Sequence, residues 1–215
     1  MAGLVQALAS VLALSVNRQR KRPSDECRSM TKHFRPAADW ELANIVADAA
    51  IGRSPLEILG SGTKQSMGRP AESVAQVSLR GLSGVMLYEP SELVMGVRAG
   101  TLLADVESQL AQRGQMLAFE PLDMGALLGK EAGFGTIGAV FATNLSGARR
   151  LSAGAARDHL IGTRAVTGHG RIVLAGGRVM KNVTGYDVSR GLAGSWGTLA
   201  VMTEVTFKEI GRAHV

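Results

Sequence analysis

Glycine is the feature of this sequence that most limits how the chain can fold. There are 27 glycines among 215 residues but only six prolines, and the glycines do not follow the three-residue period of collagen. Because glycine lacks a Cβ atom, it permits backbone conformations and close approaches that other residues avoid. The excess therefore indicates particular loops with demanding backbone geometry, and these loops are the first candidates for function.

The remaining composition favours a globular protein that does not bind nucleic acid. Apolar residues make up 46% of the chain and the mean hydropathy is +0.11, which is sufficient for a buried core. The formal net charge is +6, but the basic residues are scattered except for a run at residues 18–22. Aromatic residues, at 4%, are too few for platforms on which bases stack. The single cysteine, Cys27, excludes an intrachain disulfide and fits a reducing cytosol.

Residues 1–29 differ from the rest of the chain. An apolar stretch, Leu4–Val16, is followed by the basic run, whereas a secretory signal has its positive charge before the apolar core. The stretch is also shorter than the roughly 20 residues that span a bilayer. We expect an unstructured or non-native extension, with an interfacial amphipathic helix as the alternative. The folded domain is expected to begin near Met30.

Two helices are predicted from apolar residues at helical spacing. The first begins at Asp39, a candidate N-cap, and ends at Gly52, because apolar residues recur at i, i+3, i+4 and i+7 from Leu42. The second begins with Thr101 as its N-cap and ends at Gly114.

Short segments with strand-like composition surround these helices. In the last of them, residues 199–207, the side chains alternate with a period of two over nine residues, which predicts a strand. Residues 122–157 are rich in glycine and alanine and are expected to form a functional loop with short helical turns. The irregular order of elements favours an α+β fold over a doubly wound sheet. The predicted strands are 56–59, 76–79, 85–88, 93–98, 116–119, 160–167, 171–174 and 199–207.

The first glycine loop follows a predicted strand and has the sequence Gly60, Ser61, Gly62, Thr63, Lys64. Backbone N–H groups in such a loop can hold the pyrophosphate of a dinucleotide when no side chains block them. The Rossmann fingerprint does not fit, because Gln65 replaces its third glycine, and the Gly-Lys-Ser/Thr of a Walker A loop is absent from the chain. An ordinary tight turn is the alternative interpretation of this loop taken alone.

Two further loops have the same character. Residues 133–139 contain three glycines and are followed by Asn144, Ser146 and Gly147, and residues 181–187 lead through the turn at 194–198 into the last predicted strand. Several such loops in one domain favour a shared role in binding.

These loops together resemble the PCMH-type FAD-binding domain of FAD-linked oxidases, and in detail the FAD-binding subunits of bacterial glycolate oxidases. The resemblance covers about residues 31–208 and implies FAD held between two α+β subdomains, about 30–90 and 91–208. The segments that carry it are 34–36 (Phe-Arg-Pro), 55–58, 117–121, 146–150, 156–158 and 181–187.

The resemblance also implies which residues contact the cofactor. Residues 60–64 would hold the pyrophosphate. Arg157 would either face the flavin or form a structural ion pair with Asp158, and Lys181 would be a solvated charge or an anion partner. The other residues implied to lie along or to support the cofactor are Pro121, Gly135, Thr136, Ile137, Gly138, Asn144, Gly147, Ala200 and Val201.

Some departures from the family pattern bear on the cofactor. Members that attach the flavin covalently use a histidine in the first loop, where this chain has Thr63 and Lys64, so FAD is expected to be non-covalent. Ala139 replaces a glycine, and its methyl group would crowd the cofactor if φ there were positive. Gly191 falls within an expected helix. The four histidines show no ligand spacing, and one cysteine cannot build a zinc or iron–sulfur site.

The resemblance implies a subunit whose FAD accepts electrons from a 2-hydroxy acid such as glycolate, or from a partner subunit, and passes them to an iron–sulfur partner. The alternatives are a non-catalytic assembly subunit and a sibling enzyme acting on D-lactate or another hydroxy acid. No catalytic base is identifiable. Residues 209–215 are expected to be a non-native tail, with the substrate region outside this fragment, which alone would be inactive. A cytoplasmic location is expected, with membrane contact only through partners.

Overall fold

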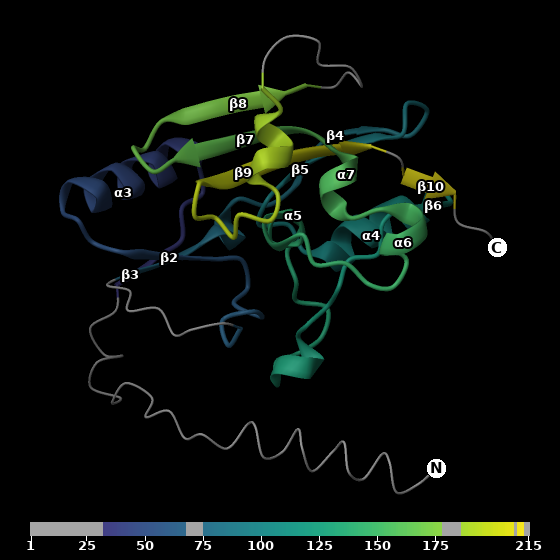
Figure 1. Cartoon of the computed structure of the whole chain (residues 1–215), viewed down its shortest axis with the longest axis horizontal. Helices are drawn as coiled ribbons and strands as arrows, with labels where there is room; N and C mark the ends of the chain where they lie inside the picture. The colour runs from purple at the N-terminus through teal and green to yellow at the C-terminus, as the bar shows by residue number, and fades with distance from the viewer. Residues whose placement is uncertain (1–31, 68–74, 178–185, 209, 213–215) are drawn as a thin grey trace, which may run out of the picture. The chain divides into compact units, whose positions relative to one another are not determined.

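The computed structural model describes residues 32–67, 75–177, 186–208 and 210–212 (Figure 1). The expected extension at residues 1–29, the expected start near Met30 and residues 181–185 of the third glycine cluster lie outside this part of the chain. Within it, no helix has the length and apolar character needed to cross a membrane.

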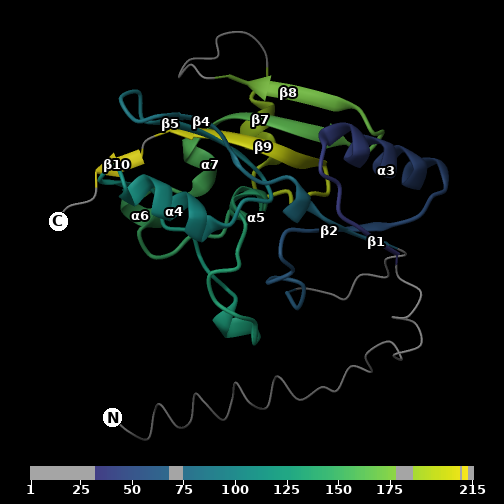
Figure 2. The same cartoon turned by 180° about the vertical axis from the view of Figure 1, so that it is seen from behind.

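A small parallel sheet forms first along the chain. It has the order β1-β3-β2, with β1 at Lys32–Phe34, β2 at Leu56–Leu59 and β3 at Ala75–Ser78. Helix α3 (Asp39–Ile51) connects β1 to β2 (Figure 2), as parallel strands require a crossover. Strand β1 was not predicted from the sequence, because three exposed residues carry no periodic signal.

A five-stranded antiparallel sheet forms the larger layer, in the order β4-β5-β9-β7-β8. The predicted strands are confirmed to within three residues at each end. Their bounds are Val85–Glu89 for β4, Val94–Arg98 for β5, Leu160–Thr167 for β7, Ile172–Gly176 for β8 and Ala200–Lys208 for β9.

Short helices cover this sheet, and the order of elements is α+β, as predicted. Strand β10, which lies within the expected tail, pairs with β6 in antiparallel fashion. The remaining elements are η1 (Leu79–Gly81), α4 (Leu103–Ala111), β6 (Gln115–Leu117), η2 (Ala126–Leu128), α5 (Ile137–Thr143), α6 (Arg150–Ala153), α7 (Ala156–His159), α8 (Val188–Leu192) and β10 (Ile210–Arg212).

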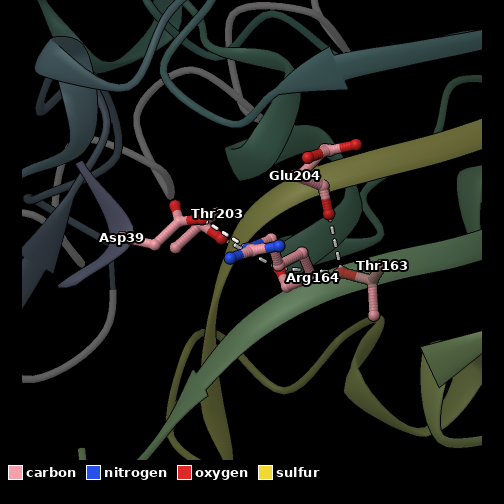
Figure 3. Close-up of polar contacts among 5 residues, drawn as sticks. All are labelled: Asp39, Thr163, Arg164, Thr203 and Glu204. Atoms are coloured by element: carbon pink, nitrogen blue, oxygen red, sulfur yellow. Dashed lines mark hydrogen bonds and ion pairs between the residues drawn. The ribbon is translucent and has the colours of Figure 1, made fainter. Parts of the chain in front are cut away.

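The two predicted N-caps are wrong. The cap position of α3 is Ala38, and that of α4 is Leu102. Asp39 instead reaches across to the large sheet, where its Oδ2 lies 2.5 Å from Arg164 Nε (Figure 3). The Thr101 hydroxyl donates to Arg98 O at 2.7 Å and accepts from Gly84 N at 2.9 Å. Both side chains therefore bond to groups outside the helix that each was predicted to cap, and neither caps the start of that helix.

A β-bulge interrupts the pairing of β7 with β9. Arg164 pairs with Glu204 and Ala165 with Met202, so Thr203 has no partner residue. Its hydroxyl donates to Arg164 O at 3.2 Å, and Thr163 Oγ1 donates to Glu204 O at 2.8 Å (Figure 3). The strand predicted at 199–207 is confirmed, but the extra residue reverses which side chains face which side of the sheet part-way along it.

The core consists of two clusters on opposite faces of the large sheet. Ala165 and Met202 belong to one, together with α4 and α5, while their neighbours Val166 and Val201 belong to the other. The second cluster also contains apolar residues of α3 and of the small sheet. Successive strand residues point to opposite faces, which explains the division.

Candidate functional site

A cleft of about 250 Å³ brings the first two glycine loops together. Ser61 and Thr136, which are 75 residues apart by number, line the same space. The cleft also receives residues from β2, α5, β9 and the turn at 194–198. The predicted site residues that line it are Gly60, Ser61, Gly62, Thr63, Lys64, Thr136, Gly138 and Val201.

The loop at residues 60–64 requires glycine at two positions, for different reasons. Gly62 has φ +75°, in the left-handed region that favours glycine. At Gly60, a Cβ atom would overlap the Thr136 hydroxyl across the cleft. The two loops therefore approach each other closely at Gly60.

This loop presents unpaired hydrogen-bond donors to the cleft. The backbone N–H groups of residues 61–64 donate to no other group in the described part of the chain. The Ser61 and Thr136 hydroxyls are buried and lack a partner among the same residues. Since buried polar groups are nearly always hydrogen-bonded, these donors suit a ligand rich in acceptor atoms, such as a pyrophosphate.

Lys64 adds a positive charge at this loop. Burial lowers the pKa of its ammonium group, and the negative charge of Asp123 partly opposes that change. The Asp123 carboxylate accepts from Gly133 N at 2.7 Å and from Gly125 N at 2.9 Å, and these bonds, with the Lys64 charge, hold the pKa of Asp123 below its usual value. Burial, with the Asp123 charge, raises the pKa of the nearby acid Glu107. Lys64 is thus a half-buried cation with a partial counter-charge.

The start of α5 supports the cleft by packing. The Gly138 N–H donates to Ala99 O at 2.9 Å, and a Cβ atom at Gly138 would overlap Ala99. Ala139 lies inside the helix and is not among the described residues with positive φ. The positive φ on which the expected crowding depended is therefore not present, although Ala139 does line the cleft.

Seven predicted site residues do not line the cleft. Ile137 and Ala200 belong to the core cluster under the large sheet, and Gly135 O accepts from Leu103 N at 2.8 Å. Of the other four, Pro121, Asn144 and Gly147 lie in the loops described next, and Arg157 lies in α7.

Those four residues brace the loops that follow α5. Pro121 forms a β-bridge with Ser146, and Gly147 N donates to Glu120 O at 3.0 Å. Asn144 has φ +51°, and its Oδ1 accepts from Arg157 N at 3.0 Å. No ion pair joins Arg157 to Asp158 among the described residues; Asp158 Oδ2 instead accepts from Ala155 N at 2.8 Å.

Sequence reasoning missed the turn at 194–198 as part of the cleft wall. Trp196 and Gly197 line the cleft, and so do Glu57 of β2 and Met202 of β9. The sequence did offer a signal, since the closely spaced Gly194 and Gly197 mark a turn that contains an aromatic residue.

Comparison with known proteins identifies relatives along most of the chain. Residues 32–176 match the family model described as FAD binding domain. The chain is 42% identical over 171 residues to glycolate oxidase subunit GlcE of Escherichia coli K12, covering 80% of this chain and 47% of that protein. It is 29% identical over 169 residues to glycolate oxidase subunit GlcD of Bacillus subtilis, covering 78% of this chain and 34% of that protein.

Two further relatives broaden the comparison. A D-lactate dehydrogenase of Archaeoglobus fulgidus is 30% identical over 175 residues, with 81% of this chain and 37% of that protein covered. A solved structure of alkyldihydroxyacetonephosphate synthase superposes with a TM-score of 0.65 at 22% identity, over 82% of this chain and 31% of that one, and shares the fold. The chain thus spans about half or less of the length of these proteins.

Proposed function

This chain belongs to the family of FAD-binding domains, whose cofactor is FAD, and on that premise we propose that its cleft holds FAD without a covalent bond. Residues 60–64 would receive the pyrophosphate, and the Thr136 and Ser61 hydroxyls would donate to it. The observation that carries the proposal is the row of unpaired N–H and O–H donors around one cleft. Lys64 supplies a cation on the same side.

The other predicted site residues would act through the loops that they hold. Pro121, Gly147, Asn144 and Arg157 join the segments around α5 by main-chain and side-chain hydrogen bonds. Ile137 and Ala200 would act through packing in the core, and Gly135 through its hydrogen bond with Leu103 N. We also propose that the FAD-binding domain consists of two subdomains that meet near residue 90.

The whole protein would oxidise a 2-hydroxy acid, with glycolate as the leading candidate. When bound, FAD supplies the redox chemistry, and the residues of this chain bind and orient it. Two relatives are named as glycolate oxidase subunits, which supports the proposal that this chain assembles with other subunits of such an oxidase. We extend the proposal to an iron–sulfur partner and to a cytoplasmic location. D-lactate is the second candidate substrate, because a D-lactate dehydrogenase is among the relatives.

The cofactor proposal is tested on the full 215-residue chain by its visible absorption spectrum with FAD. We expect a bound yellow chromophore that denaturation releases intact. Gly60→Ala should abolish this binding because its methyl group would overlap Thr136. Gly168→Ala, at a site with open space on the β7–β8 turn, should leave it unchanged. A chain that melts cooperatively but retains no flavin would contradict the proposal.

The substrate proposal needs the assembled oxidase. Anaerobic addition of glycolate or D-lactate should bleach the flavin absorption, and the faster of the two identifies the substrate. Flavin that stays oxidised with either acid would instead indicate an assembly role without turnover.

A further inference from the structure

Trp196 adopts a backbone conformation that a tryptophan rarely takes. Its φ is +56°, whereas bulky residues with positive φ are true outliers. The flanking Gly194 and Gly197 have φ of +84° and +76°. A glycine at position 196 would make the same turn without strain. The indole is therefore not explained by the needs of the turn.

Hydrogen bonds fix this turn to the end of α5. Gly194 N donates to Phe141 O at 3.1 Å, and Trp196 N donates to Ala142 O at 2.9 Å. On the other side, the Cβ position of Gly197 lies 3.9 Å from the Ile58 side chain. Trp196 is thus held at the cleft wall between α5 and β2, where it remains 46% exposed. A large, half-exposed aromatic side chain on a backbone anchored in this way suits a planar ligand.

The rest of the cleft indicates which planar group this is. Its floor is formed by the buried apolar residues Leu79, Ala99 and Val201, and its polar wall is the donor loop at 60–64. A volume of about 250 Å³ lies below the 300–1,000 Å³ typical of sites for whole drug-sized ligands. The space therefore takes one nucleoside next to a pyrophosphate. The flavin ring must also be accessible to its electron donor and acceptor. The enclosed position in the cleft is therefore left to the adenine ring.

Resting on the function proposed above, we infer that Trp196 stacks on the adenine ring of FAD while residues 60–64 hold the pyrophosphate. ADP, which contains both of these groups and no flavin, is then a sufficient ligand for the cleft. Riboflavin, which contains neither, is not.

Tryptophan fluorescence tests the contact directly, because the chain has two tryptophans. The second, Trp40, is 61% exposed on α3 and is not among the residues that line the cleft. In the full chain carrying Trp40→Phe, ADP should quench the emission of Trp196. In the chain carrying Trp196→Phe, ADP should leave the emission of Trp40 unchanged. Adenine absorbs at shorter wavelengths than tryptophan emits, so long-range energy transfer cannot produce the quenching.

Affinity and stability separate a binding role from a structural one. Trp196→Gly should weaken ADP binding about 5- to 150-fold, the range for one aromatic stack on a base. The same change should raise the melting temperature of the ligand-free chain, or leave it unchanged, because the turn loses its strained residue. Trp196→Phe should restore most of the affinity. Leu199→Ala, at a 65% exposed neighbour that does not line the cleft, is the matched control and should bind ADP normally.

Equal ADP affinity in Trp196→Gly and the parent chain would overturn this inference and leave the proposed function standing, provided that the parent binds FAD. A lower melting temperature with normal ADP binding would assign Trp196 to the fold. A parent chain that binds neither ADP nor FAD would overturn both proposals.

Discussion

Thr136 and Thr101 are both buried threonines near the start of α5, but their hydroxyl groups differ in their partners. Thr101 Oγ1 joins Arg98 O and Gly84 N, and thus ties the end of β5 to the segment before β4. Thr136 Oγ1 has no partner in the described part of the chain and faces the loop at Gly60. One hydroxyl serves the fold, and the other is available to a ligand.

Exchanging each threonine for valine should separate these roles. Thr136→Val should weaken FAD binding about 10- to 150-fold, the loss expected for one hydrogen bond to a charged group, with little change in the free energy of unfolding. Thr101→Val should cost about 1–3 kcal/mol of stability, because Gly84 N loses its acceptor, with FAD affinity retained. Flavin titration and denaturant unfolding of both variants provide the comparison, and a Thr136→Val variant with normal affinity would refute the assignment.

Lys64 should make FAD binding depend on pH at alkaline values. Burial lowers the pKa of its ammonium in the free chain, whereas a bound pyrophosphate favours the charged form and raises that pKa again. Affinity should therefore be highest below the lowered pKa and should fall as pH rises through it, with proton uptake on binding.

Calorimetric titration in buffers of different ionisation enthalpy measures this proton uptake. Lys64→Met should bind more weakly and lose the alkaline fall. Lys130→Met, in the exposed loop nearby, is the control and should keep both. An unchanged pH profile in Lys64→Met would contradict the role of the ammonium group.

At the scale of elements, the bulge at Thr203 decides which face of the large sheet carries Val201. Val205 and Phe207 lie in the same cluster as Ala200 and Met202, although their numbers differ in parity. Without the extra residue, Val201 would share the face of Val205. The bulge turns Val201 to the opposite face, where it forms part of the cleft floor.

The loop between β6 and α5 is also shaped by a single side chain. The Asp123 carboxylate binds the N–H groups of Gly125 and Gly133 and so joins the two ends of the loop. The sequence predicted a functional loop here, with short helical turns, and η2, α5 and α6 confirm the turns. The local bond to Gly125 N is one that aspartate often makes, but the bond to Gly133 N could not be predicted, because it joins positions ten residues apart.

At the scale of the whole molecule, the Asp39–Arg164 ion pair joins α3 to the large sheet. The Asp39 side chain is 13% exposed and that of Arg164 is 35% exposed. The exposure of this ion pair is therefore intermediate between that of a surface ion pair and that of a fully buried one. Arg164→Met should therefore lower the free energy of unfolding by about 1–3 kcal/mol. In a double-mutant cycle with Asp39→Asn, the two changes should be clearly non-additive.

The exposed pair Arg190–Asp187, at 3.5 Å and with side chains 47% and 58% exposed, provides the control. Arg190→Met should change stability by less than about 0.5 kcal/mol. Equal effects at the two sites, measured by denaturant unfolding, would show that the Asp39 pair contributes no more than a surface contact.

The sequence alone determined where most strands and helices lie and which loops are rich in glycine, because periodicity and backbone sterics act between near neighbours. The strand at 160–167 was predicted with its observed bounds. The three-residue strands β1 and β10 were not predicted, since their formation depends on partners distant in sequence.

Only the tertiary structure decided which glycines meet at the cleft and which side chains line it. Gly60 faces Thr136, the bulge at Thr203 turns Val201, and the end of α5 holds Trp196. Each of these depends on contacts between segments far apart along the chain. Local sequence patterns cannot encode such contacts, because they arise only when the segments pack together.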